Sequence, residues 1–178
     1  MRLRRRLLVA AAAVALLAPA ARPAAPALTA APAARFAART LTGEKFELET
    51  ALTKGPVLVD FWATWCHPCL ESLPALEKLR AQYAAQGLSV VAVSIDGPRN
   101  YARVRPFAQR LGLKMPVVID EDGSIAQKYQ VSSVPTTILI AQDGHIVRTR
   151  SGYLPGEDDA LALAVKDLLA PAAADSAR

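Results

Sequence analysis

The chain has 178 residues, of which 52% are apolar, so it can bury one hydrophobic core but is short for two. Its formal charge is +5, but Arg2, Arg4, Arg5 and Arg6 supply four of these charges and leave +1 for the chain beyond Ala20. This balance argues against a nucleic-acid-binding surface. We therefore expect one folded domain and no nucleic-acid partner.

Residues 1–20 have the pattern of a secretory signal peptide, with a basic start, an apolar run over residues 7–18 and small residues at its end. The run is shorter than the ~20 residues of a membrane-spanning helix, so we favour cleavage and keep an uncleaved anchor as the alternative. Residues 21–35 are almost only alanine, proline and arginine, which is typical of an extended linker. The N-terminus thus predicts export to the bacterial periplasm or the outer face of the inner membrane.

Hydrophobic patterning predicts an α/β domain over residues 36–170. In chain order we expect a hairpin (37–48), a strand (57–61), a helix (66–86), a strand (89–95), two helices (99–105 and 106–112), a strand (117–119), a short helix (125–129), two strands (136–140 and 145–151) and a final helix (158–169). Asp143-Gly144 predicts a two-residue turn between the last two strands. The strand, helix, strand order predicts parallel strands joined by a right-handed crossover. Residues 171–178 are predicted to be a disordered tail.

Cys66 and Cys69 are the only cysteines, and they lie where a buried strand gives way to a helix. Unpaired N–H groups and the partial positive charge at a helix N-terminus stabilise a thiolate, so we expect the pKa of Cys66 to lie below its usual value of about 8.5. Cys66 should remain accessible, with Cys69 less exposed and close enough to bond to it. Pro68 is tolerated because first-turn N–H groups have no intrahelical acceptor.

The Cys66–Cys69 pair has three other interpretations. A structural disulfide closing so short a loop contributes only about 2 kcal/mol, against about 4 to 5 for a long loop. A structural metal site needs four ligands, and the chain adds only His67 and His145 as further soft ligands, with His145 predicted to be a solvated surface residue. A peroxidase would use the same nucleophile, but a resolving thiol so close by favours disulfide exchange.

Residues 57–69, Val-Leu-Val-Asp-Phe-Trp-Ala-Thr-Trp-Cys-His-Pro-Cys, resemble the active-site segment of thioredoxin and of the exported TlpA/ResA/CcmG-like thiol-disulfide oxidoreductases. The similarity continues in the same order through residues 93–96, 116–120, 134–137 and 143–146. It covers about residues 36–170. It implies a thioredoxin fold, with a central mixed β-sheet flanked by helices, an N-terminal hairpin and a central helical insert.

The resemblance implies that Cys66 attacks a partner's disulfide and that Cys69 resolves the mixed disulfide. Asp60 is the one charge in its apolar strand, and the resemblance makes it the proton acceptor for Cys69. A buried carboxylate is costly unless its pKa rises or it finds a partner, so a solvated Asp60 at a sheet edge is the alternative. The three residues Cys66, Cys69 and Asp60 are our candidate catalytic residues.

The candidate substrate-binding residues are Trp65, His67, Pro68, Val134 and Pro135. Trp65 is predicted to lie on the apolar surface that receives a substrate, whereas Trp62 is expected in the core. The resemblance implies that the Val134–Pro135 bond is cis and faces the cysteines, which leaves the Val134 backbone free to pair with an extended substrate segment.

One departure from the family pattern concerns the helix after the cysteines. Many ResA-like members carry a glutamate where this chain has Ser72, and Glu71 is one step out of register. Any role of that glutamate is therefore not transferred to this chain.

The resemblance favours an exported reductant that keeps apocytochrome c or copper-site cysteines reduced and draws electrons from a membrane thiol transporter. Its substrates would be proteins with disulfides or Cys-x-x-Cys motifs, and its redox-active disulfide would need no cofactor or metal. A protonated His67 shifts the potential by only about 20 mV within a family range of roughly 150 mV, so it does not decide the direction. The alternatives are a chaperone that holds Cu(I) and a general disulfide oxidase or isomerase.

Overall fold

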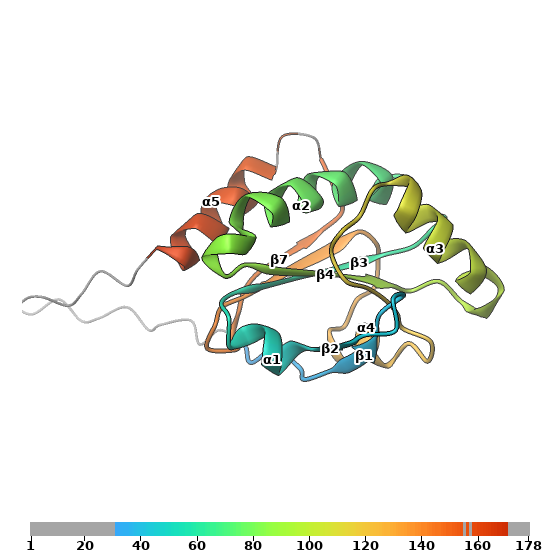
Figure 1. The fold of residues 1–178 in the computed structure, drawn as a ribbon, viewed down its shortest axis with the longest axis horizontal. Helices are drawn as coiled ribbons and strands as arrows, with labels where there is room; N and C mark the ends of the chain where they lie inside the picture. The colour runs from blue at the N-terminus through green and yellow to red at the C-terminus, as the bar shows by residue number, and fades with distance from the viewer. Residues whose placement is uncertain (1–30, 155, 157, 171–178) are drawn as a thin grey trace, which may run out of the picture.

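The computed structural model describes residues 31–154, 156 and 158–170, in which a five-stranded sheet has helices on both faces (Figure 1). The strand order is β5-β4-β3-β6-β7. The bounds of the strands are β3 (Val57–Trp62), β4 (Ser89–Ser94), β5 (Val117–Ile119), β6 (Thr136–Ile140) and β7 (Ile146–Ser151). The first three run parallel, and β6 and β7 are antiparallel to their neighbours. The predicted α/β class and mixed sheet are confirmed.

The helices divide between the two faces of the sheet (Figure 1). One face carries α2 (Cys69–Tyr83) with η1 (Ala84–Gln86), α3 (Tyr101–Arg110) with η2 (Pro98–Asn100), and α5 (Asp158–Leu169). The other face carries the hairpin β1 (Ala37–Arg39) and β2 (Lys45–Glu47) with α1 (Leu48–Leu52) and α4 (Ser124–Lys128). The predicted hairpin and final helix are therefore confirmed, whereas α1 was not predicted.

The central strand β3 is buried along its whole length, which explains why its sequence is almost continuously apolar. Side chains alternate between the faces of a strand. Leu58 and Trp62 accordingly pack in the core that contains the two cysteines and the buried residues of α2 and α5. Val59 and Phe61 pack in the second core, beneath the hairpin. This alternation places Asp60 on the same face as α2 and Cys69.

The helix that follows β4 differs from the prediction. A single helix, α3, runs through Pro106, where two helices were expected. Val104 and Ala108 are buried on one side of it. Burial of these side chains, one before and one after Pro106, offsets the loss of the one backbone hydrogen bond that the proline cannot make.

The turn between β6 and β7 also differs from the prediction. Ala141 N–H donates to His145 O over 2.9 Å, and Gly144 N–H donates to Ala141 O over 2.9 Å. Residues 142–144 therefore form a three-residue loop, and Gly144 has a φ of 88°. Asp143 lies inside this loop, and Gly144 takes the last loop position, where the backbone is left-handed. A three-residue loop that ends in such a residue is, after the two-residue turn, a common hairpin connection.

Residues 31–35, which precede the expected start at Phe36, already contact the domain. Ile146 N–H donates to Ala31 O over 2.9 Å, and Tyr129 Oη donates to Ala34 O over 2.7 Å. The predicted signal peptide, the first part of the linker (21–30) and the C-terminal tail lie outside the described residues. Among the residues that are described, no helix has the length and apolar character needed to cross a membrane.

Candidate active site

Cys66 and Cys69 form a disulfide in the segment that joins β3 to α2. Their Sγ atoms are 2.06 Å apart and their Cα atoms 5.4 Å apart. Tight turns bring them together, since Cys66 N–H donates to Ala63 O over 3.1 Å and Cys69 N–H donates to Cys66 O over 3.2 Å. The predicted bond between the two sulfurs is therefore confirmed.

The two cysteines differ in exposure. Cys66 is 4% exposed and Cys69 is 0% exposed. The predicted order is confirmed, but the expectation of an accessible Cys66 is wrong for this oxidised form, because the disulfide holds both side chains in the core cluster beneath α2. Trp65 beside them is 60% exposed, and His67 and Pro68 are exposed too. Of the two cysteines, Cys66 alone keeps some exposed surface, and it lies among these exposed neighbours.

The helix begins later than predicted. Its first residue is Cys69 and its N-cap is Pro68, so Cys66 lies in the turn before the helix rather than inside it. Leu70 N–H donates to His67 O over 3.0 Å, so first-turn amides that we expected to be free point back into this turn. The start of the helix, where its partial positive charge lies, is therefore at Cys69 and not at Cys66.

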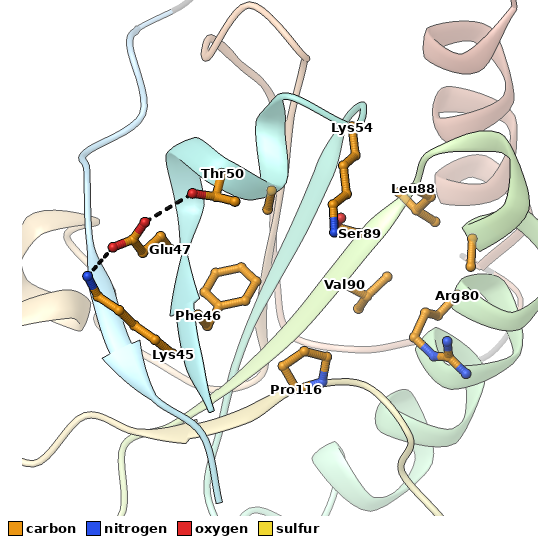
Figure 2. Close-up of a pocket in the computed structure, with 12 residues that line it drawn as sticks. Lys45, Phe46, Glu47, Thr50, Lys54, Arg80, Leu88, Ser89, Val90 and Pro116 are labelled. Carbon is orange, nitrogen blue, oxygen red and sulfur yellow. Dashed lines mark hydrogen bonds and ion pairs between the residues drawn. The ribbon is translucent and has the colours of Figure 1, made fainter. Parts of the chain in front are cut away.

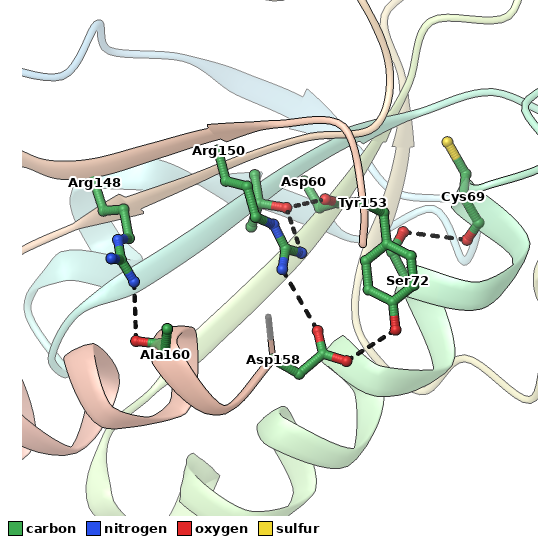
Figure 3. A network of polar contacts seen from close by, with 9 residues as sticks. Asp60, Cys69, Ser72, Arg148, Arg150, Tyr153, Asp158 and Ala160 are labelled. Carbon is green, nitrogen blue, oxygen red and sulfur yellow. Dashed lines mark hydrogen bonds and ion pairs between the residues drawn. The ribbon is translucent and has the colours of Figure 1, made fainter. Parts of the chain in front are cut away.

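Asp60 lies in the buried part of the sheet, on the face that carries the cysteines. Its side chain is fully buried, Oδ1 accepts a hydrogen bond from Thr137 Oγ1 over 2.8 Å, and Oδ2 has no hydrogen-bond partner (Figure 3). Burial raises the pKa of Asp60 from 3.8 to about 7, against the opposing effects of Thr137 and Arg150. The alternative of a solvated aspartate at the sheet edge is therefore wrong.

The Val134–Pro135 peptide bond is cis, as the resemblance implied. Pro135 is buried, and Val134 is half-buried and packs against the cluster that contains both cysteines. Pro135 O accepts a hydrogen bond from Gly152 N–H over 2.7 Å, which ties this segment to the end of β7. Val134 also packs against the second core cluster, so the segment lies directly before β6 at the border of the two cores.

A second buried carboxylate, which the sequence analysis missed, holds the segment that carries the cysteines. Asp96 accepts hydrogen bonds from Thr64 N–H (2.9 Å) and Thr64 Oγ1 (2.7 Å), and a third from Ser94 Oγ (2.8 Å). Asp96 follows β4, and Thr64 follows the neighbouring parallel strand β3. The sequence did contain a signal for Asp96, because an acidic residue directly follows a predicted parallel strand. The C-terminal ends of neighbouring parallel strands meet at one edge of the sheet.

The helix position at which the sequence departs from the family pattern holds an uncharged residue, Ser72. Ser72 is buried and its Oγ donates to Cys69 O over 3.4 Å. Glu71, one step out of register with it, is exposed. The sheet, and not α2, thus supplies a buried carboxyl group on this face of the core, at Asp60.

A cavity of about 390 Å³ has neither cysteine in its lining. Figure 2 shows the residues that line it. It is lined by the hairpin and α1, by Ser89 and Val90 at the start of β4, and by Arg80 and Ala84 near the end of α2. These are the opposite ends of β4 and α2 from those that approach the cysteines, so this cavity is not part of the redox site. Within the described residues, no group of three or more His, Cys, Asp or Glu side chains is placed to hold a metal ion.

The comparisons with known proteins agree with this geometry. The model of the AhpC/TSA family matches residues 29–149. The thiol-disulfide oxidoreductase ResA of Halalkalibacterium halodurans is 38% identical over 117 residues, 66% of this chain and 65% of its own length, which is just under two thirds. ResA of Geobacillus kaustophilus is 35% identical over 123 residues, 69% of either chain. The crystal structure of a candidate thiol:disulfide interchange protein DsbE from Chlorobium tepidum superposes with a TM-score of 0.73 at 30% identity, over 79% of this chain and 97% of that one.

Proposed function

We propose that this chain, which belongs to the AhpC/TSA family, is a thiol-disulfide oxidoreductase that exchanges the Cys66–Cys69 pair with cysteines of other proteins. One observation carries the proposal: the two sulfurs are bonded just before and at the start of α2, where Cys69 is fully buried and Cys66, 4% exposed, lies among exposed residues. The printed names of the ResA and DsbE relatives support it.

The reduced protein would act in two steps. The Cys66 thiolate attacks one sulfur of a target disulfide, and the other target sulfur leaves as a thiolate that takes up a proton. Cys69 then loses its proton and attacks Cys66 Sγ, which releases the second target sulfur as a thiol. Two electrons pass to the target, and the chain ends in the disulfide form described above.

Asp60 is the group that would accept the Cys69 proton. It lies on the same face of β3 as α2, and its pKa of about 7 is near the pH at which a base most usefully takes and returns a proton. Its Oδ2 has no hydrogen-bond partner within the described part of the chain and would thus be free to receive the proton. Exposed Trp65, His67 and Pro68, together with Val134 and Pro135, would form the surface that binds the target segment.

The direction of exchange is proposed to be reductive. The resemblance to TlpA/ResA/CcmG-like proteins supports an exported reductant for apocytochrome c or copper-site cysteines, supplied with electrons by a membrane thiol transporter. The signal-like pattern of residues 1–20 supports export to the periplasm or the outer face of the inner membrane. Equilibration with glutathione tests the direction, because a potential near or above about −180 mV would reject a reductant.

The exchange itself is tested by two matched variants, Cys66→Ser and Cys69→Ser, which remove the same atom from either end of the disulfide. We expect both to lose multiple turnover of a protein disulfide. Cys69→Ser should accumulate a mixed disulfide through Cys66, whereas Cys66→Ser should not, and mass spectrometry separates the two. Turnover by Cys66→Ser would refute the assignment. Stoichiometric Cu(I) held by wild type without any turnover would favour a copper carrier instead.

A further inference from the structure

A polar row crosses the sheet beside the proposed active site. The strand register pairs Asp60 of β3 with Thr137 of β6, and Thr137 with Arg150 of β7, so all three side chains lie on one face. Thr137 Oγ1 donates to Asp60 Oδ1 over 2.8 Å and accepts from Arg150 Nη2 over 3.4 Å (Figure 3). The guanidinium nitrogen and the carboxylate oxygen are therefore no more than about 6 Å apart.

The Arg150 side chain is held at the other end by α5 and the segment before it. It is only 13% exposed, and its Nη1 lies 3.5 Å from Asp158 Oδ1. Its guanidinium also lies over the Tyr153 ring, at 5.4 Å, and Tyr153 Oη donates to Asp158 Oδ2 over 2.9 Å. Among the residues that the structure describes, no acceptor forms a hydrogen bond with Arg150 Nε or Nη1. The largely buried guanidinium of Arg150 thus lies between the carboxyl groups of Asp60 and Asp158, and some of its N–H donors have no acceptor.

We propose that Arg150 is a positioning residue of the redox site, which acts through the Thr137 hydroxyl to stabilise the ionised form of Asp60, and that Asp158 and Tyr153 hold it there. This inference rests on the proposed role of Asp60 as the base for Cys69. It assigns a part in the chemistry to β7 and α5, far along the chain from the cysteines. Arg150 is not a catalytic residue, because Thr137 separates it from the carboxyl group.

The ionisable groups around Asp60 act in opposite directions. Asp158 of α5 and, in the reduced protein, a Cys69 thiolate of α2 both disfavour a second negative charge on this face. Arg150 of β7 opposes them and lowers the pKa of Asp60, while Tyr153 enters only through its hydrogen bond to Asp158. Without the guanidinium, Asp60 would stay protonated to higher pH and could accept the Cys69 proton only there.

The test measures the ionisation of Asp60 directly. The carboxyl carbon of Asp60 is followed by NMR against pH in the oxidised full-length protein and assigned with Asp60→Asn. Arg150→Gln should raise the Asp60 midpoint by about one pH unit, and Arg150→Lys should restore most of the difference. The matched control is Arg148→Gln, which removes the same charge from the same strand and face. Arg148 Nη1 donates instead to Ala160 O over 2.9 Å, so its loss should leave the midpoint unchanged.

A second readout connects ionisation to chemistry. The rate at which Cys69 resolves a preformed mixed disulfide is measured against pH, and its midpoint should move with that of Asp60 in Arg150→Gln. Equal midpoints in Arg150→Gln and Arg148→Gln would overturn the inference. If Arg150→Gln does not fold, Arg150→Met, which fills similar space without charge, takes its place with the same expectation. The titration needs no turnover, so failure of the oxidoreductase proposal would be a separate result.

Discussion

The buried carboxyl group of Asp60 makes the stability of this protein depend on pH in an unusual direction. Most carboxylates in folded proteins are stabilised in their charged form, so stability falls as the pH is lowered. Asp60 is the reverse case, because burial raises its pKa from 3.8 to about 7 in the folded protein. Between these two values the folded chain binds a proton that the unfolded chain releases.

The sign and size of the effect follow from proton linkage. Where the folded state holds more protons, the free energy of unfolding falls as pH rises, here by about 1.4 kcal/mol per pH unit between pH 4 and 7. The penalty is absent below pH 4 and complete above pH 7, where it reaches about 4 kcal/mol. Asp60→Asn removes it and keeps an oxygen for the Thr137 hydroxyl. The variant should therefore gain stability relative to wild type as pH rises from 5 to 8.

Urea unfolding of the oxidised proteins at pH 5, 6, 7 and 8 measures this difference. The asparagine amide adds donors without partners and costs about 1 to 3 kcal/mol, but that cost is the same at every pH. The diagnostic quantity is therefore the slope of the difference between variant and wild type, in which the titrations of all other carboxyl groups cancel. Parallel stability curves from pH 5 to 8 would refute the raised pKa and with it the case for Asp60 as a base.

Three further predictions concern residues around the site. Asp96→Asn should destabilise the protein by about 2 kcal/mol in urea unfolding, because the amide group cannot accept all the bonds from Thr64, and an unchanged midpoint would contradict this. Trp65→Ala should raise KM for a protein disulfide while stability stays within about 0.5 kcal/mol, since the ring is 60% exposed; an unchanged KM would remove it from the binding surface. Glu77→Gln should cost about 1 kcal/mol, because Glu77 Oε2 accepts two backbone N–H groups of the loop before β5, and equal melting temperatures would argue against it.

Elements with strong local patterns could be predicted from the sequence. The bounds of β5, β6 and α5 agree with the expected ranges, because apolar runs and helical spacing set them locally. The start of α2 and the continuity of α3 could not be predicted in this way. Both depend on proline residues, Pro68 and Pro106, whose effect is decided by what the flanking residues bury.

The site was predictable where its chemistry is local in sequence. The spacing of Cys66 and Cys69 indicated a disulfide that the structure contains. A lone charge in an apolar strand marked Asp60, but nothing near it in the sequence says how that charge is held. Arg150, the residue that we propose stabilises this charge, belongs to a strand with mostly exposed side chains. From the sequence alone it is indistinguishable from an ordinary surface arginine. Only the register of β3, β6 and β7 brings the two together.

The same register ties the charge of the site to its redox state. Reduction of the disulfide places a titratable thiol at Cys69 on the face of the sheet that already holds Asp60. Two negative charges in one buried site disfavour each other, so ionisation of either group makes ionisation of the other more costly. A positive charge within about 6 Å of the carboxylate lowers the cost of the first negative charge in that pair. On the proposed role of Asp60, the proton that Cys69 must lose to close the disulfide is handled by a unit that includes β7, and not by the two-cysteine motif alone.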